Sequence, residues 1–504
     1  MNQAKTIRAA LLAVLCSVSA AVFADSVNYW FLCKGGETAS LLTADGYGLK
    51  DGTATSWVDG NWLCWIGTYY YNQAAFPDKA EAAATMAKFN ISNLSPNNNT
   101  TASGTMRPYG IKFGNGTRSW NGALRIELGA GGYQAVCGDE HKVNITGGLH
   151  LTASQTWDNN NCVTLSDKTF LTAEPGVVWT AQSTPGRYAW SQNRIKVNSA
   201  NDLAGCHLVL AKSEKFILGS ATASVGFDTL TYDGPDACVS FDTSIRPKVL
   251  DAAYAKRLIL RNGGCLGSAQ GFDGVTVDIE SVTVEGGASV IGEGATYAVK
   301  DGATLPVIVS EGASLRIGSL PTDGGLDISG PGALEIPDDM LDKVGLSSFS
   351  GAITVSSCRR NFASLMDFPE TDFTFADSVL RIDSLAGFGG TLTIAGKTRM
   401  ALPPTETWPA KLTVTVSDTA TLYLPEGYGV DETKILGTAN YLAVGKGYDT
   451  VTDDVTIGSG EEYVIAYDGF TADAKITLNG GKITFPVSAT VASDVEVAAK
   501  NRAR

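Results

Sequence analysis

The sequence predicts an all-β protein built from stacked strand–turn units, and two observations lead to this prediction. Glycine supplies 56 of the 504 residues and only 18% of residues are charged, a composition that suits many turns and short strands. Short segments in which apolar and polar residues alternate recur along the chain, and this period of two is that of a strand. Strands this short cannot bury an apolar face alone, so they must stack into a sandwich, a barrel or a β-solenoid.

Residues 286–319 show the repeating unit most clearly. A Gly-Ala-Ser or Gly-Ala-Thr turn precedes a short strand three times, in residues 287–290, 302–305 and 312–315. In the last of these, Leu315 and Ile317 would point to one side of the strand, and the polar residues that alternate with them to the other. We expect this stretch to carry the fold and not the function, because it contains almost no histidine, aspartate or aromatic residue.

The other predicted strands follow in order. In the first half they cover residues 110–113, 124–128, 143–145, 149–151, 162–165 and 207–210. In the second half they cover residues 258–260, 275–279, 282–284, 392–394, 412–416 and 475–478. Residues 77–88 are the best helix candidate but could equally end in a strand over 86–91, and residues 337–344 favour a helical turn or two.

The aromatic residues mark an internal boundary. Eight of the nine tryptophans precede residue 191, so a Trp-rich front precedes a body rich in Gly, Ala, Val and Thr. We expect a cap region over residues 25–110 and a body over 111–404. Residues 405–504 would form further coils or a small β-domain. With about 22 residues per coil, residues 200–490 would make about 13 coils.

Residues 1–24 predict an export signal. Lys5 and Arg8 supply the positive region, an apolar run follows, and cleavage would come after Ala24. Cys16 lacks the small preceding residue that lipid attachment requires. No later apolar run reaches the roughly 18 residues needed to span a bilayer. We therefore expect an exported protein without a transmembrane segment, located at the cell surface, outside the cell or in the periplasm.

The charge balance restricts the partners. The net charge is −14 and the pI is near 4.8. Nucleic acid and anionic membranes both require a basic surface, so the sequence argues against either as a partner.

Eight cysteines remain after the export signal, and an even number in an oxidising compartment predicts disulfides. They are Cys33, Cys64, Cys137, Cys162, Cys206, Cys238, Cys265 and Cys358. Sequential pairing would close loops of one or two coils, through Cys33–Cys64, Cys137–Cys162 and Cys206–Cys238. The alternative is that they are inert buried thiols. No pair has C-x-x-C spacing, so neither a zinc site nor a redox site is predicted.

Several segments then follow one another in an informative order. They are Trp57 with Asn61-Trp62, Phe76-Pro77, Gly110-Ile111-Lys112-Phe113, and Leu149-His150-Leu151-Thr152-Ala153-Ser154-Gln155-Thr156-Trp157. A later echo spans residues 330–355, with a G-x-G-x-L-x-I and an FSG-x-ITV pattern. Together they resemble bacterial autotransporter-associated β-strand repeat proteins. The resemblance implies a right-handed parallel β-helix (β-solenoid) with a Trp-rich N-terminal cap, exposed on or secreted from a Gram-negative-type cell. Residues 400–504 lack the pattern of a membrane barrel, so we expect a passenger-like β-helix with no C-terminal barrel.

Motifs for catalysis and cofactor binding are absent from the sequence. It has no P-loop, no G-x-S-x-G, no H-E-x-x-H and no EF-hand loop, and we predict no cofactor. Its three histidines, His141, His150 and His207, are too scattered to predict a metal site. Adjacent strand residues face opposite sides, so Cys206 and His207 should not form a nucleophile–base pair.

Acidic pairs could supply the carboxylates of a polysaccharide-cleaving β-helix enzyme. They are Asp338 and Asp339, Asp453 and Asp454, and Glu461 and Glu462. Such a site needs carboxylates about 5–9 Å apart, whereas neighbours in sequence point apart. Arg359 and Arg360 form a basic doublet inside the body, and no acidic cluster accompanies them in the sequence. We therefore predict no catalytic site.

One aromatic cluster is a candidate glycan-binding site: Trp57, Trp62, Trp65, Tyr69, Tyr70 and Tyr71. These rings could stack on sugars, but we favour a cap that closes the first coil. The predicted function is that of an exported structural or adhesive β-solenoid, without catalytic activity, that presents loops to cell-surface or extracellular glycans or proteins. The first alternative is a polysaccharide lyase or glycoside hydrolase on the same fold. The second is a carbohydrate-binding protein that uses these aromatic residues.

Overall fold

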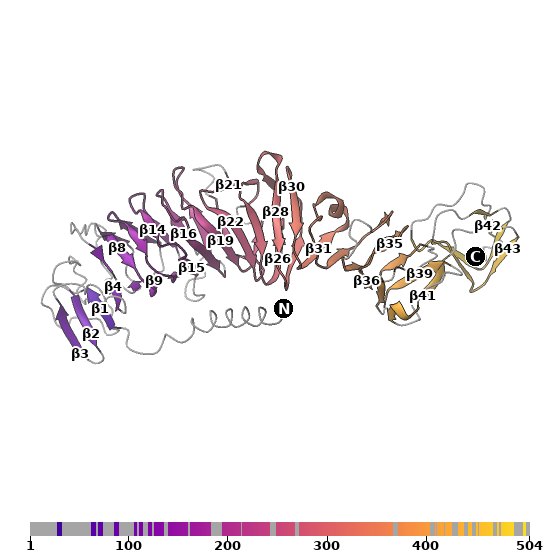
Figure 1. Cartoon of the computed structure of the whole chain (residues 1–504), viewed down its shortest axis with the longest axis horizontal. Coiled ribbons are helices and arrows are strands. Elements are labelled where there is room, and N and C mark those ends of the chain that lie inside the picture. Colours follow the sequence, from indigo (N-terminus) through magenta and orange to yellow (C-terminus); the bar gives the residue numbers. More distant parts are fainter. Residues whose placement is uncertain are drawn as a thin grey trace. The chain divides into compact units, whose positions relative to one another are not determined.

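A computed structural model of the chain shows a β-solenoid of about 13 turns with almost no helix (Figure 1). The all-β fold and the β-solenoid architecture expected from the sequence are confirmed. The structure describes residues 28–32, 62–66, 69–73, 85–89, 105–107, 110–113, 119–122, 125–135, 140–159, 162–182, 194–212, 214–241, 248–267, 272–365, 371–403, 409, 411–417, 419–425, 432–437, 442–445, 450–451, 453–466, 471–472, 475–487 and 497–499.

The chain divides into two compact units. The first unit comprises residues 1–230, 237–247 and 252–255, and the second comprises residues 231–236, 248–251 and 256–504.

Strands, most of them paired in parallel, form three faces in the first unit. The longest face has the order β3 (Tyr69–Gln73), β2 (Trp62–Ile66), β1 (Asn28–Leu32), β4 (Thr85–Phe89), β6 (Gly110–Phe113), β9 (Gly132–Ala135), β12 (Gln155–Asn159), β15 (Val178–Gln182), β17 (His207–Ala211) and β19 (Phe227–Asp233). The second face has β7 (Ser119–Gly122), β10 (His141–Ile145), β13 (Cys162–Leu165), β16 (Arg194–Val197), β18 (Lys215–Leu218) and β20 (Cys238–Val239). The third face has β5 (Thr105–Met106), β8 (Arg125–Leu128), β11 (Leu149–Leu151) and β14 (Leu171–Ala173).

The second unit begins with three faces and continues with two. One face contains β22 (Ala255–Arg261), β25 (Ser281–Val284), β28 (Thr304–Val309) and β30 (Gly325–Ser329), and another β21 (Val249–Leu250), β24 (Val275–Val277) and β27 (Tyr297–Val299). The longest has β23 (Cys265–Leu266), β26 (Gly287–Ile291), β29 (Ala313–Ile317), β31 (Ala333–Pro337), β32 (Ile353–Ser356), β34 (Phe373–Ala376), β36 (Thr391–Ala395), β38 (Thr413–Val416) and β40 (Ile435–Gly437). The later coils add β33 (Asn361–Phe362), β35 (Val379–Ile382), β37 (Arg399–Ala401), β39 (Thr421–Pro425) and β41 (Leu442–Gly445).

Residues after 445 form three small parallel sheets. They contain β42 (Thr450–Val451) with β45 (Thr471–Ala472), then β43 (Val455–Gly458) with β46 (Ile476–Asn479) and β48 (Val497–Ala499), and β44 (Glu462–Val464) with β47 (Lys482–Thr484). Short 3₁₀ helices occur at η3 (Lys300–Gly302), η4 (Asp338–Lys343) and η5 (Glu432–Lys434). In the part of the chain that the structure describes, no helix is both long and apolar enough to cross a bilayer.

The Gly-Ala turns and strand alternation explain the coil. In β29, Leu315 and Ile317 are fully buried while the residues between them are half-exposed, as the sequence predicted. Gly302 and Gly312 precede their strands with φ values of +67° and +78°, a conformation that glycine adopts without the clash of a Cβ atom. The turns therefore change the direction of the chain sharply between faces, and strands such as β29 bury one side only.

Stacked aromatic rings fill the core of the first unit. The ring centroids of Tyr133 and Trp157 lie 4.8 Å apart, and those of Trp157 and Trp179 lie 4.5 Å apart. Both tryptophans are fully buried, which removes about 150–250 Å² each from water, worth at most about 4–6 kcal/mol per ring. His141 is also fully buried, and its Nδ1 is hydrogen-bonded to the Tyr133 hydroxyl. Burial lowers the pKa of His141 to about 3.

Two local predictions can be compared directly with these elements. The 3₁₀ helix η4 confirms the helical turn predicted within residues 337–344. β4 confirms the strand alternative at the end of residues 77–88, whereas residues 77–84 lie outside the described residues.

The predicted disulfides are not found among the described cysteines, which are all buried reduced thiols: Cys162, Cys206, Cys238, Cys265 and Cys358. The pairing Cys206–Cys238 is wrong because the two residues belong to different faces. Cys206 precedes β17, and Cys238 lies in β20. The pairing Cys137–Cys162 is wrong because Cys162 is reduced. The side chains of Cys33 and Cys64 lie outside the described residues. The alternative of inert buried thiols therefore describes the five cysteines above.

Candidate functional site

The aromatic candidates for glycan binding lie in the first strands. Two are in β2 and three in β3, namely Trp62, Trp65, Tyr69, Tyr70 and Tyr71. β2 pairs antiparallel with both β3 and β1, and β1 pairs in parallel with β4. The backbone thus places these strands beyond the first parallel pair of the solenoid, which is where a cap would lie. The side chains of these residues, and Trp57 altogether, are not described, so sugar stacking stays a prediction.

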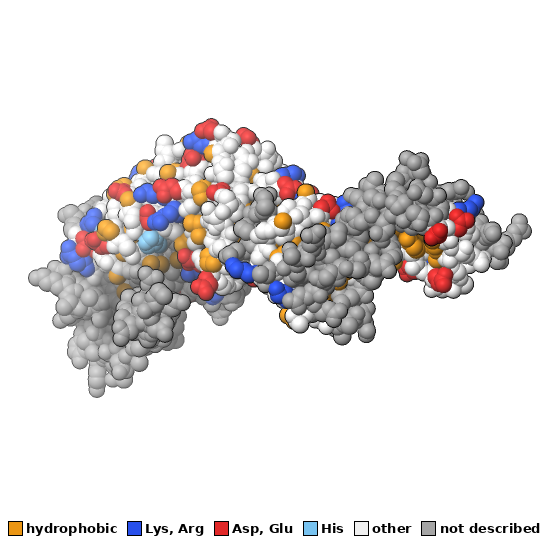
Figure 2. Space-filling view, turned by 45° about the vertical axis from the view of Figure 1, so that its right-hand side comes forward, with side chains coloured by type: hydrophobic (Ala, Val, Ile, Leu, Met, Phe, Trp, Pro, Cys, Tyr) orange, Lys and Arg blue, Asp and Glu red, His pale blue; other side chains and the backbone are white. Residues whose placement is uncertain are grey.

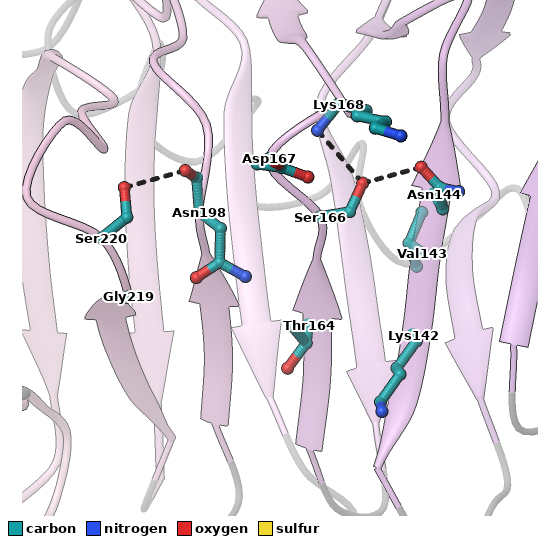
Figure 3. Close-up of a pocket in the computed structure, with 10 residues that line it drawn as sticks. All are labelled: Lys142, Val143, Asn144, Thr164, Ser166, Asp167, Lys168, Asn198, Gly219 and Ser220. Atoms are coloured by element: carbon teal, nitrogen blue, oxygen red, sulfur yellow. Dashed lines mark hydrogen bonds between the residues drawn. The ribbon is translucent and has the colours of Figure 1, made fainter.

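A polar groove provides a second candidate that sequence reasoning missed. It has a volume of about 580 Å³ and crosses the second face of the first unit, over β10, β13, β16 and β18 (Figure 3). Its side chains come from successive coils, and they include Lys142, Asn144, Thr164, Ser166, Asn198 and Ser220. No local sequence motif indicates the groove, because residues about 20–30 positions apart in sequence form it together.

Strand alternation and parallel register create this row of polar groups. In β10, Val143 and Ile145 face the core, so Lys142 and Asn144 face outward. The register pairs Val143 with Leu165, and Leu165 with Val197. One position further along the chain, Asn144, Ser166 and Asn198 consequently stack on the outer surface. Neighbouring strands are about 4.8 Å apart, so the groove offers a polar group at each coil.

Hydrogen bonds fix the polar row. The Ser166 hydroxyl donates to Asn144 Oδ1 at 2.9 Å, as Figure 3 shows. The Asn198 amide Nδ2 donates to the Leu165 carbonyl at 3.0 Å, and the Ser220 hydroxyl donates to the Asn198 carbonyl at 3.0 Å. These bonds fix the orientation of the Asn144 and Asn198 side-chain amides. A preoriented side chain loses less entropy on binding.

A glycine makes room for two side chains at one end of the groove. An ideal Cβ atom at Gly219 would lie 2.1 Å from Lys196 Cε and 2.3 Å from Asn198 Oδ1. Both distances are far below van der Waals contact. Lys196 of β16 and Asn198, which follows this strand, therefore extend over the Gly219 backbone of the next coil, and a Cβ atom at position 219 would displace them.

The charged residues at the groove differ in sign from the net charge of the whole protein. Lys142 and Lys168 line it together with Asp167, and Lys196 lies over its glycine floor. Glu140 stands next to this group, where it accepts a hydrogen bond from Thr164 at 2.5 Å. Its other oxygen is 3.9 Å from the Lys142 ammonium, whose side chain is 69% exposed. The three lysines thus outnumber the two acidic residues beside them, Asp167 and Glu140, on a protein of net charge −14. Figure 2 shows blue and red side chains interspersed over the face of this unit that is in view.

The third face of the first unit carries a separate charged cluster. His150 is hydrogen-bonded to Thr172 at 2.8 Å and to Glu174 at 3.1 Å. Glu127 pairs with His150 across the strands and forms ion pairs with Arg125 and Arg107 at 3.0 and 2.7 Å. Burial alone would raise the pKa of Glu127, but the hydrogen bonds from the two arginines lower it overall. Glu127 is held as a carboxylate, which suits a structural ion pair better than a proton donor.

A third polar cluster surrounds Arg360. Arg360 forms an ion pair with Asp338 at 2.7 Å and another with Asp342, two acidic residues that the sequence did not associate with this arginine. Asp338 and Asp342 come from η4 in the preceding coil, 18–22 residues earlier in the chain. The Arg360 guanidinium also covers the Phe362 ring at 4.4 Å. The carboxylates are thus paired with a permanent cation, and the cluster joins two coils.

Cys206 and His207 lie as expected. Cys206 is fully buried and His207 is half-buried, on the opposite side of the chain. Burial raises the pKa of the Cys206 thiol to about 12, so it is protonated at neutral pH and a poor nucleophile.

Comparisons with known proteins identify no relative. No family model matches the chain, and no curated protein or solved structure matches it. Within the described residues, no three His, Cys, Asp or Glu side chains gather as metal ligands. The β-solenoid that the autotransporter-associated resemblance implied is present, and the polar groove is a candidate site that several of its coils build together.

Proposed function

We propose that this protein is an exported structural and adhesive β-solenoid that binds glycans and has no catalytic activity. The observation that carries the proposal is the row of Asn, Ser and Thr side chains in the groove, which comes from successive coils. Amides and hydroxyls both donate and accept hydrogen bonds, as the hydroxyl groups of sugars do. Their coil-to-coil spacing of about 4.8 Å is close to the length of one sugar residue in an extended polysaccharide.

The solenoid supports an adhesive role mechanically. Ladder hydrogen bonds and stacked side chains hold each coil to the next, so a groove built across coils keeps its spacing under load. Ion pairs between residues 22–23 positions apart add to this, such as Lys300 with Asp278 at 2.7 Å and Arg316 with Glu293 at 2.8 Å. Exposed pairs of this kind contribute little individually, about 0.2–1 kcal/mol each.

The alternative of a polysaccharide-cleaving enzyme has one observation in its favour, the cluster of Glu127, His150 and Glu174. General acid catalysis needs a carboxyl group that is protonated near neutral pH, and the lowered pKa of Glu127 opposes that role. The non-catalytic proposal is therefore the better supported one.

A glycan array combined with a polysaccharide-degradation screen tests the proposal on the purified full chain. We expect binding to one or more glycans and no release of sugar fragments. Binding should decrease when Asn198 is changed to Ala, because this removes the side-chain oxygen over Gly219. Fragment release that disappears in Glu127→Gln would establish the enzyme alternative instead.

A further inference from the structure

The polar groove has a charge that selects among glycans. Lys142 and Lys168 line it and Lys196 lies over Gly219, while the acidic residues beside them are Asp167 in the lining and Glu140, 3.9 Å from the Lys142 ammonium. The rest of the protein is acidic overall, with a net charge of −14. Long-range repulsion from an acidic protein disfavours anionic ligands. Three lysines at one groove therefore make its local charge differ from the average charge of the protein surface.

We propose that the groove binds an acidic polysaccharide, whose carboxylate or sulfate groups contact these three lysines while its hydroxyls contact the polar row. The proposal rests on the proposed function and names the class of glycan. Asn144, Ser166 and Asn198 would provide hydrogen bonds to the sugar rings. The polymer would lie across the strands, along the stack of coils, because the polar groups follow one another in that direction.

The position of Lys196 is the strongest support for a built site. Its side chain extends over Gly219 from the neighbouring coil, where any Cβ atom would displace it. An ordinary surface lysine extends into water, where its ammonium is fully hydrated. Here the stem lies on the backbone beside the Asn198 amide, and both groups are held at the groove.

The groove composition favours a polysaccharide over a nucleic acid. Sites for single-stranded nucleic acid combine basic side chains with aromatic rings on which bases stack. None of the described residues that line the groove is aromatic. The amide and hydroxyl row instead matches a ligand that presents many hydroxyl groups, and the lysines match its acidic groups.

Binding measurements with four polymers test the inference on the full chain. The probes are polygalacturonate for carboxylates, dextran sulfate for sulfates, dextran as the neutral polymer and single-stranded DNA as a polyanion without sugar hydroxyl rows. We expect binding to polygalacturonate, dextran sulfate or both, and weaker binding to dextran. Affinity should fall about 20- to 40-fold between 50 and 200 mM NaCl if about three ionic contacts form. Tighter binding of polygalacturonate than of dextran sulfate would identify carboxylates as the preferred acidic groups, and the reverse order would identify sulfates.

Variants locate the binding. Lys142→Gln and Lys196→Gln should each lower the affinity for the acidic polymer about two- to fivefold, the range for exposed ionic contacts. Gly219→Ala should lower it as well, because the added methyl group displaces Lys196. Lys256→Gln removes the same charge from an exposed strand position on another face and is the matched control. Asp167→Asn should raise the affinity about twofold, a gain that misfolding cannot produce.

The outcomes separate the two levels of the proposal. If dextran binds as well as the acidic polymers and the lysine variants bind it normally, the acidic-glycan inference is overturned while glycan binding stands. Stronger binding to DNA than to either acidic polysaccharide would also overturn it, since charge alone would then decide. If no polysaccharide binds while the protein is folded, both the inference and the proposed function fail.

Discussion

Acidification from pH 7 to pH 5 should destabilise the first unit through one buried histidine. His141 is fully buried against Tyr133 and its pKa is lowered from 6.5 to about 3. In the unfolded chain it would titrate near 6.5. As the pH falls below 6.5 the unfolded state binds a proton that the folded state does not, so stability that is complete above pH 6.5 is progressively lost.

The magnitude follows from this difference. Each pH unit between the two pKa values costs about 1.4 kcal/mol, and the onset near pH 6.5 reduces the sum. We therefore expect a loss of about 2 kcal/mol between pH 7 and pH 5. The carboxylates with lowered pKa values, such as Glu127 and Asp273, have reference values of 4.5 and 3.8, so most of their effect comes below pH 5. This pH window therefore isolates the histidine.

Urea unfolding at pH 7 and pH 5, followed by tryptophan fluorescence, measures the effect. His141→Gln cannot be protonated in this range, so the difference between the two pH values should shrink by about 2 kcal/mol even if the variant is less stable at both. His150→Gln, on the outer face, is the matched control and should keep the loss that His141 causes. An unchanged pH difference in His141→Gln would refute the reasoning.

Three further predictions concern coil contacts and thiols. Gly351→Ala should lower the free energy of unfolding by about 2–4 kcal/mol in thermal or urea melts, because its Cβ would lie 1.6 Å from a backbone carbonyl of the preceding coil; wild-type stability would contradict this. Arg360→Gln should cost about 1 kcal/mol by leaving Asp338 without its ion pair, and Arg360→Lys should recover part of the loss. Cys206 and Cys358 should resist iodoacetamide at pH 8 and react in denaturant, as read by mass spectrometry, because burial raises the pKa of each thiol to about 12; rapid alkylation of the native protein would show that these thiols are accessible.

The sequence could predict what depends on neighbours along the chain. The alternation at Leu315 and Ile317 predicted which residues are buried, because strand geometry fixes the facing of every second side chain. Gly302 and Gly312 predicted the turns, because few other residues adopt a positive φ without cost. Stacking of such units, together with the resemblance to autotransporter-associated repeats, was sufficient to predict a β-solenoid.

Properties that depend on which coils become neighbours could not be predicted from the sequence. The ion pair between Asp338 and Arg360 forms because η4 lies one coil before Arg360, and nothing in the sequence around either residue indicates it. The cysteines formed an even set, yet the wound chain buries Cys206 and Cys238 on different faces. The net charge of −14 describes the chain as a whole. It does not indicate that three lysines lie close together at the groove.

The groove shows why this limit is physical. Local periodicity determined that Asn144, Ser166 and Asn198 each face outward. The parallel register, set by loops of different length between the strands, decided that they stand side by side. It also decided that Lys196 lies over Gly219. A one-residue change in any loop would alter that register, so the strands follow from the sequence pattern, whereas the site exists only in the tertiary structure.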